Sequence, residues 1–226
     1  NLHLLENSMV EGIILSVTEK DRNDEYYRRL IDNGIPIVFF NRPSNEVEAS
    51  KVVIDDFRMA FFAVEHVLYA NGTKRTRPLH LMGPKGIFNS ATRHQGYKQA
   101  LSKHGIDPAP DTFVQCRDIS RECGFETMNA ILDGDRIPDA VFCFNDQLAI
   151  GALKAIKKRG YRIPEQIAAL LTEPQLSSVA QPLDLIGETA ANLLLEKIKN
   201  PDAPDRTVVL DARINIREST DVRPQQ

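Results

Sequence analysis

Two adjacent polar residues, Asn145 and Asp146, stand where a buried strand is expected to pass directly into a helix. Residues 140–144 form a continuous apolar run, which is typical of a strand covered on both faces. Apolar residues then recur with helical spacing, so a helix is predicted to follow at once. One of the two polar side chains, Asp146 more than Asn145, is expected to cap this helix. The other would project beyond the carboxyl end of the strand, where open α/β sheets bind ligands.

Arg93 and Asn145 carry groups that suit a hydroxylated ligand. The guanidinium of Arg93, at the start of a helix predicted over about residues 90–104, offers forked donors for paired hydroxyls or a carboxylate. The amide of Asn145 has both a donor and an acceptor, which suits a vicinal diol. From the residues alone, Arg93 is better explained as a surface arginine paired with an acid. For Asn145, ligand contact and helix capping are about equally supported.

Motifs for catalysis are missing. The sequence has no Gly-x-Ser-x-Gly and no Walker loop, and residues 83–86 are too short for a phosphate loop. Asp55 and Asp56 are adjacent, so on an extended segment they would face opposite ways. Three cysteines at irregular spacing and five scattered histidines argue against a disulfide framework and a zinc site. We therefore expect no enzyme activity, no metal site and no cofactor.

Composition and charge are those of an ordinary globular protein. Apolar residues make up 42% of the 226-residue chain, charged residues 26%, and the net charge is −3. DNA-binding domains usually carry a basic surplus, so this stretch is not expected to bind DNA by itself. No apolar run is long enough to span a bilayer, and no secretory signal is visible. These features favour a cytoplasmic protein with reduced thiols.

Strand and helix signals alternate along the chain, which predicts mostly parallel sheets covered on both faces. The pattern fits two small sheets better than one long one, with a break near residues 74–78. Strands are predicted over residues 10–16, 35–40, 51–54, 77–82, 112–116, 140–144 and 167–170, with one or two more over 208–216. Helices are predicted over residues 1–8, 22–33, 57–68, 90–104, 120–132, 146–159 and 183–199.

Several segments, in this order, resemble the effector-binding core of the LacI/GalR (lactose-repressor) family of bacterial transcription regulators. They are residues 35–42, 52–57, 83–84 followed by Arg93–Tyr97, 144–152, 176–182 with Gly187, and 216–220. The resemblance runs nearly end to end. It implies a fold similar to type I periplasmic sugar-binding proteins: two doubly wound α/β subdomains with parallel sheets, joined by three crossovers around a ligand cleft. On this reading, the N-terminal subdomain is 1–76 plus 182–205, and the C-terminal subdomain is 77–181 plus 206–220.

The resemblance also implies roles for individual residues. Ligand contact becomes the favoured role for Arg93, and Asn41 would face the cleft from the other subdomain, although a plain Asn-Arg-Pro turn is a rival explanation. Ile119 falls where some family members place an aromatic ring over the sugar. Phe144 could supply an apolar face instead, although a core role is favoured, and Gln181 could reach the ligand or serve as a hinge. The predicted ligand-binding set is therefore Arg93, Asn145, Asn41, Asp146, Ile119, Phe144 and Gln181.

Two departures from the family pattern stand out. The helix-turn-helix and hinge that precede the core in the family are absent from this chain, as is the first strand of the first subdomain. After Ala169 the family continues through a further loop, whereas here residues 170–174 follow directly. We therefore expect an interruption of the chain close to Ala169–Leu170, and one acidic or amide ligand contact of the family cannot be placed.

The resemblance favours an effector-sensing and dimerisation core that binds a small sugar-like molecule and alters the operator affinity of the full-length repressor. Its partners would be the effector, operator DNA through a missing N-terminal domain, and a second copy in a homodimer, with no membrane. The alternative is a periplasmic-type sugar-binding protein of a transporter, which would need export. A helix-turn-helix in the full gene would support the first reading, and a signal peptide the second.

Overall fold

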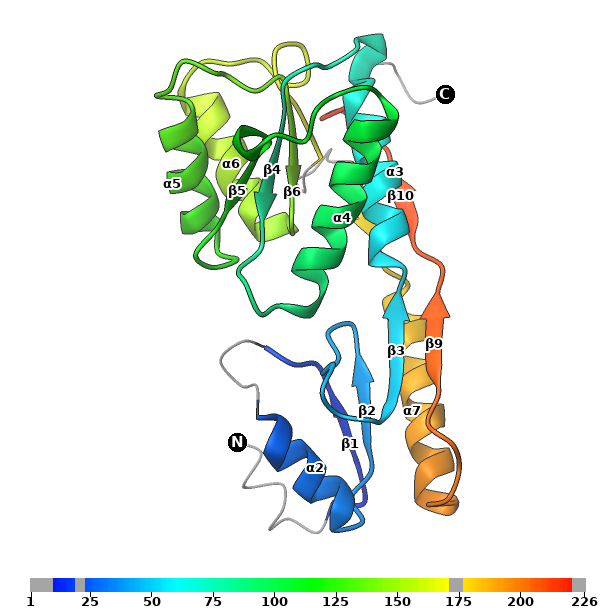
Figure 1. Ribbon diagram of the computed structural model, residues 1–226. Coiled ribbons are helices and arrows are strands. Elements are labelled where there is room, and N and C mark those ends of the chain that lie inside the picture. The colour runs from blue at the N-terminus through cyan, green and yellow to red at the C-terminus, as the bar shows by residue number, and fades with distance from the viewer. Residues whose placement is uncertain (1–9, 19–22, 171–176, 221–226) are drawn as a thin grey trace. The chain divides into compact units, whose positions relative to one another are not determined.

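The computed structural model describes residues 10–18, 23–170 and 177–220 of the chain, drawn as a ribbon in Figure 1. Two compact units divide it. The first unit is Asn1–Asp55 with Gln181–Ala212, and the second unit is Asp56–Ala180 with Arg213–Gln226. The predicted helix over residues 1–8 lies outside the described residues. Within the described ranges, no helix combines the length and the apolar character needed to cross a membrane.

The first unit is a four-stranded, all-parallel sheet in the order β1-β2-β3-β9. Helix α2 covers one face, because Tyr27 and Leu30 pack with Ile37 and Phe39 of β2. Helix α7 covers the other face, where it meets Val38, since alternate residues of a strand point to opposite faces. The elements are β1 (Ile13–Leu15), α2 (Asp24–Asp32), β2 (Ile37–Phe40), β3 (Ser50–Ile54), α7 (Leu183–Lys199) and β9 (Thr207–Leu210).

The second unit has a parallel sheet in the order β5-β4-β6-β7 and a separate antiparallel pair, β8 with β10. Its strands are β4 (Pro78–Met82), β5 (Phe113–Gln115), β6 (Ala140–Cys143), β7 (Ala168–Leu170), β8 (Ser178–Ala180) and β10 (Arg213–Asn215). Its helices are α3 (Asp56–Leu68), α4 (Phe88–Lys103), α5 (Arg121–Ile131) and α6 (Asp146–Lys158), with short 3-10 turns η2 (Ala70–Gly72) and η3 (Pro110–Thr112).

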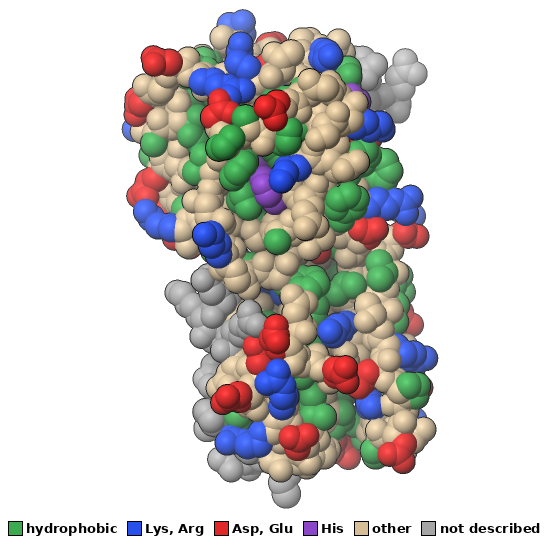
Figure 2. Space-filling model, viewed as in Figure 1, with side chains coloured by type: hydrophobic (Ala, Val, Ile, Leu, Met, Phe, Trp, Pro, Cys, Tyr) green, Lys and Arg blue, Asp and Glu red, His purple; other side chains and the backbone are tan. Residues whose placement is uncertain are grey.

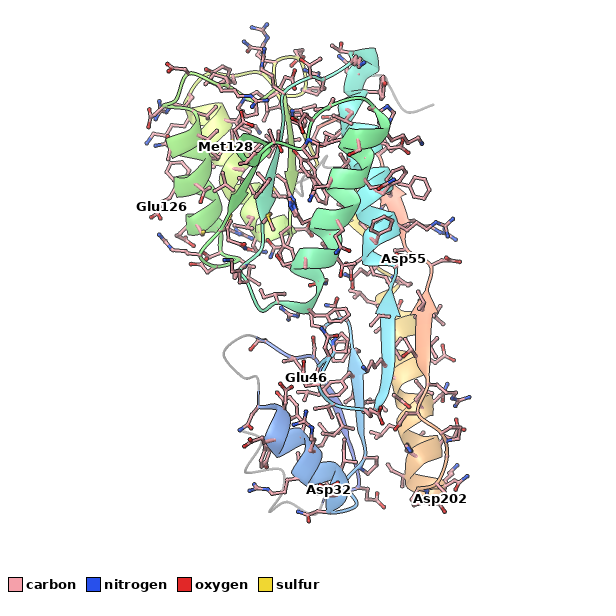
Figure 3. The ribbon with its side chains drawn as sticks, viewed as in Figure 1. Asp32, Glu46, Asp55, Glu126, Met128 and Asp202 are labelled. Atoms are coloured by element: carbon pink, nitrogen blue, oxygen red, sulfur yellow. The ribbon has the colours of Figure 1, made fainter. Side chains whose placement is uncertain are left out.

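Alternation along β6 divides the core of the second unit into two layers. Val141 and Cys143 pack with the apolar sides of α5 and α6, whereas Phe142 packs with α3 and α4 on the opposite face. Figure 3 shows the same division on α5, where the buried Met128 turns inward and the exposed Glu126 projects outward. Each large apolar side chain fully buried in this way contributes roughly 1.5–3 kcal/mol to folding.

Two glycines let α5 and α6 approach closely. A Cβ on Gly124 would overlap the carbonyl of Leu148 in α6, and a Cβ on Gly151 would overlap the carbonyl of Arg121 in α5. The backbones therefore touch at this crossing. This contact fixes α6, and with it the turn that carries Asn145 and Asp146.

The predicted fold class is confirmed: each unit is a parallel sheet with helices on both faces. The boundaries between the units differ from those expected. The chain passes between units after Asp55, Ala180 and Ala212, so α3 belongs to the second unit. The physical reason is packing, since Ala60, Val64 and Leu68 of α3 share a core with α4 and β6.

The chain is not interrupted between Ala169 and Leu170 themselves, so the expected interruption does not fall at that bond. Both residues lie in β7, which continues in register with Val141 and Phe142 of β6. Ala168 and Ala169 are fully buried, as central strand residues should be. Residues 171–176, which follow, lie outside the described residues.

Candidate functional site

Five of the seven predicted site residues belong to the second unit, and they cluster where its parallel strands end. Phe144, Asn145 and Asp146 follow β6 directly, and Ile119 follows β5. Arg93 lies in the second turn of α4, which follows β4 through a short loop (Figure 1). Because the carboxyl ends of parallel strands share one edge of the sheet, these residues lie at a single edge.

Arg93 is held by three contacts. Its Nε donates to Oδ1 of Asp56 at 2.7 Å, and its Nη1 donates to the carbonyl oxygen of Phe144. The guanidinium also lies 4.8 Å from the centre of the Phe144 ring, within cation–π range. The pairing with an acid, which sequence alone favoured, is therefore present. The N–H groups of Nη2 have no partner among the described residues and remain able to bind a ligand.

Asn145, and not Asp146, is the N-cap of α6, so the expected order of the two roles is reversed. Asn145 has extended backbone angles (φ −147°, ψ 173°), and its Oδ1 accepts a hydrogen bond from the N–H of Leu148 at 3.0 Å. Its Nδ2 donates to the carbonyl of Ile119 at 3.4 Å. Both ends of the amide therefore already bind backbone groups.

Asp146 occupies the first helical position of α6 and keeps its carboxylate accessible. Partial burial raises the pKa of this carboxyl, while the positive charges of Arg93 and Arg217 act to lower it. Asp146, Arg93 and Arg217 are thus close enough to interact electrostatically. Together they supply acceptors and donors at the same edge.

Phe144 and Ile119 supply apolar surface. Phe144 is 5% exposed and its ring packs against Gly83, where an added Cβ would overlap the ring. Ile119 is half-buried and packs against the core of the second unit. The core role favoured for Phe144 is therefore present, and the face of its ring is covered by Arg93.

Asn41 and Gln181 belong to the first unit. Asn41 follows β2 in the left-handed conformation (φ 57°), which asparagine tolerates better than most residues. Its Oδ1 is buried and has no hydrogen-bond partner among the described residues. The carbonyl of Gln181 accepts from the N–H of Leu183 at the start of α7.

Sequence reasoning missed two buried polar residues of the second unit. Asp56, the first residue of α3, is 4% exposed and anchors Arg93. Figure 3 labels its neighbour Asp55, where the chain leaves β3. Asn89, in the first turn of α4, is 2% exposed, and its Oδ1 lacks a partner among the described residues. The only sequence signal was that polar residues interrupt otherwise apolar strand–helix junctions.

Next to Arg93 on α4 lies His94, which forms a pair with the fully buried His80 of β4. The two Nδ1 atoms are 3.2 Å apart and the rings are stacked. Burial lowers the pKa of both imidazoles, and each is further disfavoured as a cation by a neighbouring positive charge. Figure 2 shows a histidine at the surface of the second unit among apolar side chains. No cluster of three possible metal ligands occurs among the described residues.

A pocket of about 350 Å³ lies in the first unit, at the opposite end of its sheet from Asn41. It is bordered by residues that precede the strands, including Glu11 before β1, Pro36 before β2 and Ala49 before β3. Lys197 of α7 also borders it, but its ammonium is engaged by the carbonyl of Ala203 at 2.6 Å. This pocket is therefore separate from the predicted site residues.

Comparison with known families gives the class of protein. The family model described as "Periplasmic binding protein-like domain" matches residues 66–220, more than half of the chain. The chain therefore belongs to this family, and the fold predicted from the sequence is the one that the family shares.

The individual proteins to which the chain is similar are transcription regulators, in line with the resemblance seen in the sequence motifs. The chain is 32% identical over 234 residues to the HTH-type transcriptional repressor CytR of Escherichia coli (strain K12), covering 99% of this chain and 66% of CytR. It is 29% identical to the HTH-type transcriptional regulator CelR of Thermobifida fusca, covering 95% of this chain and 65% of CelR. The chain thus spans slightly less than two thirds of these relatives.

Solved structures similar to this chain also include transcription regulators, two of them with a bound sugar. A complex of the transcriptional regulator CelR with cellobiose matches with a TM-score of 0.85 and 28% identity, covering 96% of this chain and 68% of that chain. A LacI family transcriptional regulator from Enterococcus faecium with bound ribose matches with a TM-score of 0.82 and 26% identity, covering 98% and 84%.

Proposed function

We propose that this chain is the effector-binding and dimerisation core of a bacterial LacI-type repressor. It binds a small sugar-like molecule, which changes the affinity of the full-length homodimer for operator DNA. The observation that carries the proposal is the polar edge of the second unit, where an anchored arginine presents unpaired N–H groups beside an accessible carboxylate. The relatives that support it are regulators, two of them solved with a bound sugar.

Within this proposal, the seven predicted residues have different roles: hydrogen bonding to the ligand, apolar contact with it, or support of the turn. Arg93 and Asp146 contact ligand hydroxyls, and Phe144 and Ile119 border them with apolar surface. Asn145 acts mainly by holding the turn, because its amide is already engaged. Asn41 and Gln181 contribute from the first unit, and the buried, unpartnered Oδ1 of Asn41 supports ligand contact.

The effector would act by changing the relation between the two units. The chain passes between them three times, after Asp55, Ala180 and Ala212, so a hinge motion would be carried by these short segments. A coupling of about 1–3 kcal/mol changes operator affinity roughly 5- to 150-fold. DNA contact itself belongs to another part of the protein, because the net charge is −3 and acidic and basic side chains are interspersed on the face of each unit that Figure 2 shows. The full-length protein is then cytoplasmic and not an enzyme.

Thermal unfolding of the chain with a panel of sugars, such as cellobiose and ribose, and sugar acids tests effector binding. A ligand at about 100 times its dissociation constant adds roughly 2.7 kcal/mol of stability. Arg93→Lys keeps the charge beside Asp56 but loses the fork, so it should weaken binding at least about tenfold. Arg159→Lys, an exposed arginine at the far end of α6, is the matched control and should bind normally.

Measuring effector affinity with and without operator DNA tests whether the effector regulates DNA binding. By reciprocity, operator DNA must change the effector affinity of the full-length protein by the same factor that effector changes operator affinity. Equal effector affinities with and without operator would rule out allosteric regulation. Export of the full-length protein would instead support the transporter alternative.

A further inference from the structure

We propose that Asp56 is a positioning residue for Arg93, and that the Asp56–Arg93 pair makes the site select an uncharged, hydroxyl-rich effector over an anionic sugar acid or phosphate ester. This inference rests on the proposed function, because it takes Arg93 to face the effector. It goes further by naming the charge class of the ligand and the residue that sets it.

The first step is the geometry of the pair. Asp56 Oδ1 lies 2.7 Å from Arg93 Nε, and the two side chains are 4% and 16% exposed. Arg93 comes from α4 and Asp56 from the start of α3, and these helices pack together in one core. A carboxylate buried to this degree binds its partner without much competition from water, so the contact is stronger than a surface ion pair.

The second step is orientation. Asp56 holds Nε, the Phe144 carbonyl holds Nη1, and the Phe144 ring lies against the guanidinium plane. Three contacts in different directions fix a planar group. The N–H groups of Nη2 are left for a ligand, so the arginine acts as a directed donor of hydrogen bonds rather than as a mobile cation.

The third step is charge. Asp56 neutralises Arg93, and at the same edge the carboxylate of Asp146 opposes the charge of Arg217. The described charges of this cluster therefore sum to zero. An anionic ligand would lose its hydration without meeting excess positive charge, which is costly. A neutral diol can accept from Nη2 of Arg93 and donate to Asp146 without that cost.

An NMR experiment tests the positioning role without any effector. In ¹H–¹⁵N spectra of the wild-type chain, the Nε–H of Arg93, assigned by its loss in Arg93→Lys, should exchange slowly with water. Asp56→Asn should speed its exchange at least about tenfold, whereas Asp55→Asn removes the same charge one residue away and should leave it slow. Fast exchange in the wild type, or slow exchange in Asp56→Asn, would overturn the positioning role.

A binding experiment tests the selectivity. Inorganic phosphate and glucuronate should not stabilise the wild-type chain or Asp55→Asn, whereas Asp56→Asn should bind phosphate roughly ten- to a hundredfold more tightly. Glucose is the neutral partner of glucuronate. Tight phosphate or glucuronate binding by the wild type, or no gain in a folded Asp56→Asn, would overturn the selectivity. If Asp56→Asn does not fold, Asp56→Ser and the wild-type measurements decide. If no sugar binds but both experiments give the expected results, the proposed function fails while the role of Asp56 stands.

Discussion

Replacing Asn145 distinguishes helix capping from ligand contact, the two roles that the sequence supports about equally. In Asn145→Ala, the N–H of Leu148 loses the Oδ1 that accepts from it, and the Ile119 carbonyl loses a donor. Loss of an N-cap costs about 0.5–2 kcal/mol, and the long 3.4 Å bond to Ile119 adds little. We expect the free energy of unfolding to fall by about 1–2 kcal/mol. For a chain of this size, each 1 kcal/mol lowers the melting temperature by about 2–4 °C.

Asn145→Asp is the informative partner variant. It keeps an oxygen that can cap α6, and its negative charge at a helix N-terminus is favourable, so stability should change by less than about 0.5 kcal/mol. Asn23→Ala is the matched control in the first unit, because Asn23 caps α2 through an equivalent bond to the N–H of Tyr26 at 3.1 Å. It should cost a similar amount but leave effector binding unchanged.

Urea unfolding followed by circular dichroism gives these free energies, provided that the slope of the transition is the same for all variants. The reasoning would be refuted if Asn145→Ala cost less than about 0.3 kcal/mol, or if Asn145→Asp were as destabilised as Asn145→Ala. If Asn145→Asp is stable yet loses effector affinity, Asn145 contacts the ligand through its amide as well as capping the helix.

Three further outcomes follow from buried groups of the second unit. Burial lowers the pKa of His80 and His94 below the usual 6.5. Below about pH 6.5 the unfolded state therefore binds more protons than the folded state, and the free energy of unfolding should fall as the pH drops. His80→Leu should weaken that fall, and pH-dependent urea titrations that show no difference would contradict it. Burial raises the pKa of Cys116 to about 12, and Cys123 and Cys143 are buried too. Iodoacetamide at pH 7.5 should therefore label none of the three thiols before the protein unfolds. Labelling of the native protein at the rate of a free thiol would contradict this. Gly151→Ala should lower the free energy of unfolding, measured in urea, by about 1–3 kcal/mol, because the added Cβ would overlap the Arg121 carbonyl. Gly134 has room for a Cβ, so Gly134→Ala should cost much less. Equal costs would show that α5 and α6 do not cross tightly.

Local patterns predicted the elements well because most of them have a strong period. The apolar run of β6 and the helical spacing after it identified the strand, the turn and α6. Strand β8, three residues long and half-buried throughout, has no such period and was not predicted. Asn145 and Asp146 are both good caps, so their order depends on backbone angles that composition does not encode.

Assignments that depend on long-range packing were the ones that local patterns missed. The stripe on α3 predicts a buried face but not which sheet it covers, so α3 was placed with the wrong strands. The partner of Arg93 is 37 positions away in the sequence, and nothing near either residue marks the pair. Asp56 was considered only as the neighbour of Asp55, because adjacency is visible in a sequence and spatial proximity is not.

The unpartnered amide oxygens of Asn41 and Asn89 add an independent argument about the ligand. Each is buried, each follows a parallel strand at its carboxyl end, and neither has a donor among the described residues. Leaving a buried acceptor without a donor costs about 1–3 kcal/mol, so such atoms usually meet water or a ligand. A hydroxyl group can donate to such an amide oxygen, whereas a carboxylate oxygen can only accept. The first unit contains Asn41 and the second contains Asn89, so each unit by itself holds a buried acceptor that a hydroxyl group or a water molecule would satisfy.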